Sequence, residues 1–271
     1  MTYYQISEQN LGEASRIPII KLHDSEEVFT TLAAEMTDTI KSNNAAGKRT
    51  VFICPVGPVG QYPIFVRMVN EERISLKNCW FFNMDEYLND DGTYIDISSP
   101  LSFRGFMQRQ VYSQIDEELL MPAGQRVFPD PHTPERGDRL LEELGGADIC
   151  FGGIGINGHL AFNEAREDIT AEEFRLLGTR VLKLTPETKT ANAISDRGGA
   201  IEAMPNMAVT IGIRQILAAR KVRLGVFREW HRSVIRRAAY GEVSAAFPAA
   251  LLQGHPDAII YTNHIAAQQP F

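Results

Sequence analysis

Residues 149–164 read Ile-Cys-Phe-Gly-Gly-Ile-Gly-Ile-Asn-Gly-His-Leu-Ala-Phe-Asn-Glu, and no other segment combines glycines and titratable side chains so densely. Glycines that follow an apolar run let the backbone turn sharply and approach a ligand closely. His159 directly after the glycines, and Glu164 five residues later, are suited to general acid–base chemistry. We therefore expect a buried strand that ends in a ligand-binding turn.

Outward from this turn, short β-rich segments alternate with amphipathic ones along the chain. We expect strands at 50–54, 79–84, 147–151, 181–184, 208–213, 222–227 and 258–261. We expect helices over 25–42, around 64–69, from Ser99-Pro100 onward, from Thr185-Pro186 onward, and around 234–239. This alternation predicts one α/β domain over residues 1–271, with a doubly wound, mostly parallel sheet and helices on both faces.

Composition narrows the class of protein. The chain has 271 residues and a formal net charge of −7, which argues against a general nucleic-acid binder. The three cysteines lie in or beside apolar stretches, as free thiols in a reducing compartment would, and none has zinc-site spacing. We find no signal-peptide pattern and no apolar run long enough for a membrane span. We expect a cytoplasmic protein that binds no metal, nucleic acid or membrane.

Three loops leave the C-terminal ends of predicted strands, at 55–60, 85–89 and 152–164. In a doubly wound sheet, ligands bind at these ends, in the crevice where the strand order reverses. The first loop, Pro-Val-Gly-Pro-Val-Gly, is a glycine and proline turn, and the second begins with Asp85 and Glu86. We expect the three loops to meet in one crevice.

Each titratable residue of these loops has two interpretations. Asp85 either caps a turn at the end of a strand or lies at a pocket mouth, where partial burial would raise its pKa and let it move a proton. A lone histidine such as His159 is more often structural, but Glu164 and Asn157 nearby favour a functional role. Asn163 is expected to brace the turn through bonds to the backbone.

The glycine-rich turn does not predict a nucleotide cofactor. Residues 153–158 match G-x-G-x-x-G, but the predicted strand that follows ends at Thr185 rather than at an acidic residue. The phosphate-binding pattern G-x-x-x-x-G-K-[ST] is absent from the sequence. We expect no cofactor.

Two blocks of the sequence resemble the signature motifs of glucosamine-6-phosphate deaminases, also called isomerases. They are residues 82–87, Phe-Asn-Met-Asp-Glu-Tyr, and residues 152–164. The similarity extends to residues 55–60, 102–107, 188–192 and 209–213. The resemblance implies a modified Rossmann-like fold, no metal or redox cofactor, a small-molecule sugar or sugar phosphate as substrate, and a homo-oligomer.

The resemblance also implies a role for each catalytic candidate. His159 would open the sugar ring, and Glu164 and Asn157 would orient its imidazole. Asp85 would move a proton between C2 and C1, after which ammonium is lost and a ketose forms. The resemblance places substrate contacts at Val56, Gly57, Pro58, Val59, Glu86, Arg104, Gly155, Gly158, Arg180 and His231.

The chain departs from the family pattern at several positions. Beside His159, Asn157 replaces a family aspartate. Where a phosphate would bind, Ile194 aligns with a family arginine and His231 aligns with a family lysine. The loop at 55–60 lacks hydroxyl side chains, and Pro58 has no N–H. These changes predict weak or no turnover of glucosamine 6-phosphate. The basic residues that could replace the lost donors are Arg104, Lys189, Arg228 and Arg232.

Two further points stay open in the sequence. Residues 165–178 contain a capping-box pattern at 170–173 and are either a surface helix or, as the resemblance implies, a mobile lid over the site. The chain is either an amino-sugar isomerase/deaminase, a lactone hydrolase like the 6-phosphogluconolactonases, or a sugar-sensing module without catalysis. The 82–87 block and Asn163-Glu164 favour the first class.

Overall fold

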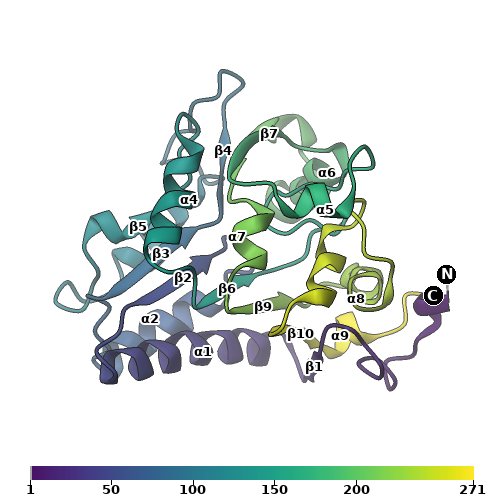
Figure 1. Ribbon diagram of the computed structural model, residues 1–271, viewed down its shortest axis with the longest axis horizontal. Helices are drawn as coiled ribbons and strands as arrows, with labels where there is room; N and C mark the ends of the chain where they lie inside the picture. Colours follow the sequence, from purple (N-terminus) through teal and green to yellow (C-terminus); the bar gives the residue numbers. More distant parts are fainter. Residues whose placement is uncertain (1) are drawn as a thin grey trace.

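Seven parallel strands form the central sheet (Figure 1), and the computed structural model describes residues 2–271 apart from the side chain of Asp196. Across the sheet they are β1 (Ile19–Leu22), β10 (Ala258–Asn263), β9 (Lys221–Val226), β6 (Ile149–Gly152), β2 (Thr50–Cys54), β3 (Cys79–Asn83) and β5 (Arg126–Val127). Every neighbouring pair runs parallel. The predicted doubly wound α/β fold is confirmed.

The strand order reverses between β2 and β6, which lie side by side at the middle of the sheet. From β2 the chain continues outward through β3 to β5, and from β6 it continues in the other direction through β9. The loops at 55–60 and 152–164 leave these two strands at the same edge. They therefore flank the crevice in which doubly wound sheets bind ligands.

Alternate residues of the central strands enter cores on opposite faces of the sheet. In β2, Phe52 and Cys54 belong to one buried cluster, whereas Val51 and Ile53 belong to the other. The helices α1 (Ser25–Ala45) and α2 (Gln61–Glu71) cover the first face and run beneath the sheet in Figure 1. Because helices cover both faces, the strands are apolar on both sides.

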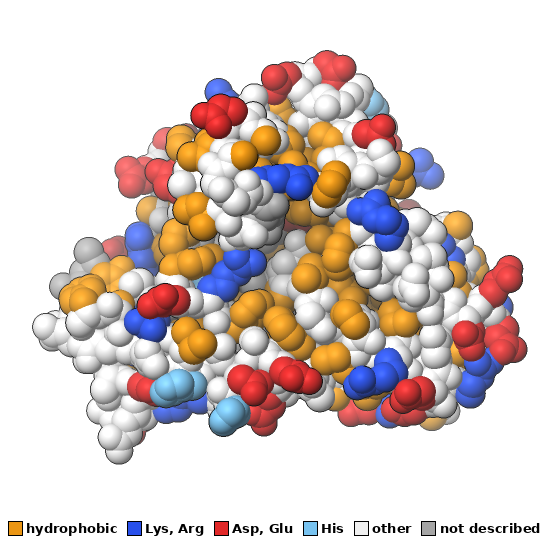
Figure 2. Space-filling model, turned by 180° about the vertical axis from the view of Figure 1, so that it is seen from behind, with side chains coloured by type: hydrophobic (Ala, Val, Ile, Leu, Met, Phe, Trp, Pro, Cys, Tyr) orange, Lys and Arg blue, Asp and Glu red, His pale blue; other side chains and the backbone are white. Residues whose placement is uncertain are grey.

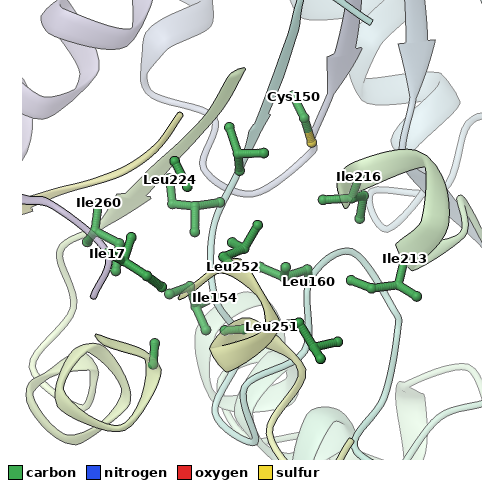
Figure 3. Packing of buried hydrophobic residues seen from close by; sticks show 14 of the residues in the cluster. Ile17, Cys150, Ile154, Leu160, Ile213, Ile216, Leu224, Leu251, Leu252 and Ile260 are labelled. Atoms are coloured by element: carbon green, nitrogen blue, oxygen red, sulfur yellow. The ribbon is translucent and has the colours of Figure 1, made fainter. Parts of the chain in front are cut away.

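The opposite core anchors the glycine-rich turn. Ile154 and Leu160, from either side of the turn, are buried next to Leu251 and Leu252 of η5 (Pro248–Gly254), as Figure 3 shows. The helices α7 (Ile213–Leu217) and α8 (His231–Tyr240) complete this face. Apolar side chains thus hold the backbone that carries His159.

A second, smaller sheet corrects one prediction. The segments at 181–184 and 208–213 were expected in the main sheet, but β7 (Arg180–Lys183) and β8 (Met207–Thr210) pair antiparallel with β4 (Asp85–Leu88) instead. β4 leaves β3 after the single residue Met84, so Asp85 begins a strand rather than a loop. Its residues, Asp-Glu-Tyr-Leu, lack the apolar alternation that would have predicted a strand, although all four are buried.

Several of the remaining elements differ from the predictions, among them the short helical segments that no pattern indicated. β1 and the two-residue β5 were not predicted, and the helix expected at Ser99-Pro100 begins later, at α3 (Phe103–Met107), where the Ser102 hydroxyl accepts from Gly105 N–H at 3.1 Å. The expected helix after Thr185 is confirmed as α6 (Pro186–Arg197), with Thr185 as its cap. The other helical segments are η1 (Thr2–Gln5), η2 (Gln108–Tyr112), η3 (Ala123–Gln125), α4 (Pro134–Glu143), α5 (Ala171–Arg175), η4 (Ile201–Ala203) and α9 (His264–Ala267).

The surface is mixed in character. On the face drawn in Figure 2, hydrophobic side chains gather around a hollow in the middle, and acidic and basic side chains are interspersed along the edges. Among the helices of residues 2–271, none has the length and apolar character that a membrane crossing requires.

A buried arginine joins the two ends of the chain, which lie next to each other in Figure 1. Arg236 of α8 is fully buried, and its guanidinium donates to the main-chain oxygens of Ile6, at 2.8 and 2.9 Å, and of Ala267, at 2.8 Å. A third partner is the carbonyl of Arg232, at 2.8 Å. Main-chain carbonyl oxygens therefore accept the hydrogen bonds of the buried guanidinium.

We predict that Arg236→Met lowers the free energy of unfolding by about 3 kcal/mol, because buried carbonyls lose their donors. Urea denaturation measures the change. Arg136→Met is the matched control, because this substitution removes the same charge from an exposed position on α4. Equal stability of the two variants would show that Arg236 does not tie the ends together.

Candidate active site

The edge of the sheet where the strand order reverses holds a cavity of about 630 Å³. The loops after β2, β6 and β9, the start of β4, and α6 supply its walls. The predicted loops at 55–60 and 152–164 do meet here, but residues 85–88 contribute as strand β4 rather than as a loop. The polar side chains that line the cavity belong to Asp85, Tyr87, Ser102, His159, Asn192, Ser195, Arg197, Arg228 and His231.

Asp85 is a buried carboxylate at the wall of this cavity. Its backbone is held by pairing with Thr210 of β8, and its side chain belongs to a residue only 7% exposed. No hydrogen bond reaches the Asp85 carboxylate from any residue that the structure describes. Burial, with a smaller contribution from Glu86, raises the pKa of Asp85 well above its usual value. Asp85 can therefore carry a proton at pH values where an exposed aspartate cannot.

Glu86 has a different role from its neighbour and does not line the cavity. Its two carboxylate oxygens accept from the backbone N–H groups of Tyr87, Phe103 and Arg104 at 2.9 to 3.0 Å. They also accept from the Ser102 hydroxyl at 2.8 Å and from Arg104 Nε at 3.2 Å. Because these bonds use the fully buried carboxylate, we interpret Glu86 as a support of the fold, and its substrate contact stays a prediction.

Four side chains form a connected network behind the cavity wall. The side-chain amide of Asn157 donates to Glu164 Oε2 at 2.8 Å, and its carbonyl Oδ1 accepts from His159 Nδ1, also at 2.8 Å. The hydroxyl of Thr188, on α6, donates to Glu164 Oε2 at 2.9 Å and lies 3.1 Å from His159 Nδ1. The network connects His159 to Glu164 through Asn157.

This network determines which ring nitrogen of His159 can accept a proton from a ligand in the cavity. The carboxylate of Glu164 requires a donor from Asn157, so the Asn157 carbonyl must face His159 and accept its Nδ1–H. The other ring nitrogen, Nε2, is then left with a free lone pair, and His159 lines the cavity. The ring lies over Gly155, where an added Cβ would come within 2.1 Å of Nε2. Glycine is therefore required at 155 to make room for the imidazole.

Glu164 keeps its negative charge in this setting. Burial alone raises its pKa, but the hydrogen bond and charge of His159, with bonds from Asn157 and Thr188, lower it to about 2. Its Oε2 lies 3.5 Å from His159 Nδ1. Glu164 thus supplies to the imidazole the negative charge that a neutral asparagine at 157 does not.

His231 lines the cavity but is held as a neutral structural side chain. Burial is the main cause that lowers its pKa to about 3. Its Nδ1 accepts from the backbone N–H of Arg228 at 2.8 Å, so its Nε2 carries the proton and donates to the Ile154 carbonyl at 3.1 Å. Both nitrogens are used, and a phosphate would find neither a charge nor a free donor here.

The loop at 55–60 presents an apolar wall to the cavity. Val56, Gly57, Pro58 and Val59 line it as expected, and an added Cβ at Gly153 would lie 3.3 Å from the Gly57 carbonyl, so the two loops are in close contact. Phe29 of α1 and Phe227 extend the wall, with ring centroids 4.8 Å apart in an edge-to-face arrangement. The wall offers no charged side chain.

Of the other predicted contact residues, Gly155 lines the cavity, whereas Arg104, Arg180 and Gly158 do not. Arg104 pairs with Glu86 and stacks on Tyr94 at 4.0 Å. Arg180 donates to Asn163 Oδ1 at 2.8 Å, and burial lowers its pKa to about 10. Gly158 adopts a φ of +84° and packs against Phe247. We interpret these three residues as supports of the fold rather than as substrate contacts.

The segment at 165–178 does not cover the cavity. Its capping box is present, but Phe174 of α5 is fully buried in the core, and no residue of 165–178 lines the cavity. Arg175 also donates to the Leu251 carbonyl at 3.3 Å. These contacts favour the packed helix over the lid.

Thr188 and Arg197 are among the site residues that the sequence reasoning did not single out, with Tyr87, Ser102, Asn192 and Ser195 of the cavity lining. Thr188 lay within a motif of the resemblance, and its position in the first turn of α6 was a usable signal. Arg197 ends α6 at the cavity, and only the tertiary structure shows where that end lies.

Known proteins include relatives whose sequences are similar to this chain over most of its length. The chain is 31% identical over 253 residues to glucosamine-6-phosphate deaminase of Bacillus velezensis, covering 92% of this chain and 98% of that protein. It is 35% identical over 217 residues to the enzyme of that name from Shewanella loihica, covering 78% and 75%. No protein-family model matches the chain.

Two solved structures show the same architecture. One is of a monomeric glucosamine-6-phosphate deaminase, with a TM-score of 0.79 at 27% identity, covering 92% of this chain and 98% of that one. The other is 6-phosphogluconolactonase of Trypanosoma cruzi, with a TM-score of 0.67 at 16% identity, covering 92% and 95%. The second likeness concerns the fold alone. Since the first structure is of a monomer, the expected homo-oligomer stays a prediction.

We predict that removing the charge of Glu86 destabilises the fold, whereas removing that of its neighbour Asp85 does not. Glu86→Gln should lower the free energy of unfolding by about 3 kcal/mol, because it breaks a buried ion pair and leaves backbone donors poorly matched. Asp85→Asn should leave it unchanged or raise it, because an unpartnered buried charge is removed. Chemical denaturation at neutral pH compares the two. Destabilisation of Asp85→Asn by as much as Glu86→Gln would refute the assignment.

The pH dependence of stability should reveal the neutral state of His231. Its folded-state pKa of about 3 lies below the ordinary histidine pKa of 6.5, so the unfolded chain binds an extra proton between these pH values and stability falls as pH drops from about 6.5. His231→Gln should remove a slope of about 1.4 kcal/mol per pH unit between pH 5 and 6.

The matched control is His23→Gln, because the His23 side chain is 90% exposed. The test compares how the free energy of unfolding of each variant changes from pH 5 to pH 7. An unchanged slope in His231→Gln would mean that His231 is not held neutral.

Proposed function

We propose that this chain, which belongs to the glucosamine-6-phosphate deaminase family, converts an amino sugar to a ketose with release of ammonia. The observation that carries the proposal is the cavity that Asp85 and His159 share. Asp85 is a buried carboxylate with a raised pKa, and His159 has its Nδ1 bonded and its Nε2 free. Two proton carriers that face one cavity suit an isomerase.

Ring opening is the step we assign to His159. Its Nε2 would take the proton from the O1 hydroxyl of the closed sugar and return a proton to the ring oxygen as the C1–O5 bond breaks. The imidazole is transiently cationic, and Glu164 stabilises that charge from 3.5 Å. Asn157 and Thr188 hold the ring in position throughout, because both contact Nδ1.

Proton transfer between carbons is the step we assign to Asp85. As a carboxylate it would take the proton from C2 of the open amino aldehyde while O1 takes a proton from the substrate's own C2 ammonium group, which gives a neutral enolamine. The same group then returns its proton to C1, leaving a C2 imine. Water adds to the imine, and ammonium departs as the C2 carbonyl forms. The burial of Asp85 keeps its proton available within the cavity.

The distal group of the substrate is where we expect this chain to differ from the family pattern. Neither His231 nor the wall at 55–60 offers a charged donor, and Ile194, at the position of the family arginine, is 67% exposed and does not line the cavity. A 6-phosphate would therefore lose charge-assisted hydrogen bonds. We propose weak turnover of glucosamine 6-phosphate, and a distal hydroxyl, carboxylate or differently bound phosphate in the preferred substrate.

The activity is tested by ammonia release from a panel of amino sugars and amino-sugar phosphates. We expect Asp85→Asn to abolish release, with a loss of at least about a thousandfold in kcat, because a general base is removed. In the wild type, kcat/KM should fall on the acid side at a pH well above 4, since protonated Asp85 cannot accept the C2 proton and its pKa is raised.

Two outcomes would contradict the proposal. Hydrolysis of sugar lactones without ammonia release would indicate a lactonase, and sugar binding without turnover would indicate a sensing module. Asp85→Asn that retains wild-type ammonia release would separately remove Asp85 from the mechanism. The control variant is Asp91→Asn, because Asp91 lies in the exposed turn after β4 and does not line the cavity.

A further inference from the structure

We infer that Arg197 and Arg228 form an anion-binding site that holds the phosphate of an amino-sugar phosphate, in place of donors on the loop at 55–60. The inference rests on the proposed function and specifies its substrate class. Both residues line the cavity but come from different elements: Arg197 ends α6, and Arg228 follows β9. They are the Lys or Arg residues that line the cavity, within the part of the chain that the structure describes.

The other basic residues that the sequence offered already have partners. Arg104 is paired with Glu86, and Lys189 Nζ donates to Asn206 Oδ1 at 2.7 Å. Arg232 donates to the Ile265 carbonyl at 3.0 Å and to Gln268 Oε1 at 2.7 Å. None of these three residues lines the cavity. Of the four candidates, Arg228 alone remains for a ligand.

No described carboxylate neutralises the two arginines. Glu229, next to Arg228 in sequence, pairs with Arg232 at 3.3 Å instead. Nη1 of Arg228 donates to the hydroxyl of Ser195, which also lines the cavity. This bond brings the loop after β9 against α6, so Arg228 and the last turn of α6 lie on one side of the cavity. Asp85 is the acidic residue among the lining residues.

The ligand chemistry follows from the charge and shape of these donors. Guanidinium groups are planar, permanently charged and suited to bidentate bonds with phosphate or carboxylate oxygens. Two of them match the charge of a phosphate dianion better than that of a single carboxylate. Apolar side chains of Val59, Phe227 and Trp230 line the same cavity beside the two arginines. The structure thus favours a phosphate monoester.

Calorimetric titration with inorganic phosphate tests the site without any need for turnover. We expect Arg228→Gln and Arg197→Gln each to raise the phosphate Kd by about tenfold or more, because each removes a charge-assisted bond. Arg139→Gln is the matched control: it removes the same charge from the exposed face of α4, where Arg139 pairs only with Glu135. Its Kd should equal that of the wild type.

Three results would overturn the inference. They are a phosphate Kd that is unchanged in both cavity variants, an equal loss of affinity in Arg139→Gln, and acetate binding as tightly as phosphate, which would indicate a site for a carboxylate. Thermal unfolding of each variant checks that the fold is retained, and the exposed position of Arg228 makes Arg228→Gln the safer of the two.

The failure of this inference can be told apart from failure of the proposed function. If phosphate binds and depends on Arg228, but no amino sugar releases ammonia, the anion site stands and the deaminase proposal fails. If ammonia is released but the KM for amino-sugar phosphates is the same in wild type and Arg228→Gln, the anion site fails alone. An increase of about tenfold or more in KM with little change in kcat supports both.

Discussion

The pairing of β2 with β6 at the middle of the sheet is the constraint on which the site depends. Because the chain leaves these strands in opposite directions, their C-terminal loops separate and leave a crevice between them. The crossover helices then close both faces of the sheet, which buries the strands and fixes the crevice at one edge. The loop at 55–60 forms one wall of the cavity, and the turn that carries His159 forms another.

The second sheet supplies the crevice with an acidic residue whose backbone is held by strand pairing. β4 follows β3 after one residue and pairs with β8, so Asp85 is fixed at the junction of the two sheets. Glu86 points away and supports α3, which shows how alternation along a strand separates two adjacent carboxylates. One becomes an unpartnered buried acid, and the other becomes part of the framework.

The sequence predicted the main sheet well and the site in part. Strands such as β2 and β6 are continuous apolar runs, which is what burial on both faces demands, and Thr185-Pro186 marks the start of α6 correctly. β4 was missed because its burial comes from pairing with distant strands rather than from its own composition. The spacing of His159, Glu164 and Asn157 singled them out, and the structure places them in one hydrogen-bonded network. Glu86 and Arg180 lie outside the cavity lining and bond to partners that only the tertiary structure brings together, so their substrate contacts stay predictions. For His231, the sequence position indicated a ligand contact, but two main-chain bonds fix its tautomer and use both nitrogens.

The central claim is that Asp85 carries a proton from C2 to C1 of a sugar inside the cavity. An amino-sugar substrate labelled with deuterium at C2 tests this most directly, with the ketose product analysed by NMR. Because Asp85 is only 7% exposed, part of the label should appear at C1 of the ketose before it exchanges with water. A ketose with no deuterium at C1, or the same transfer of deuterium to C1 in Asp85→Asn, would contradict the account.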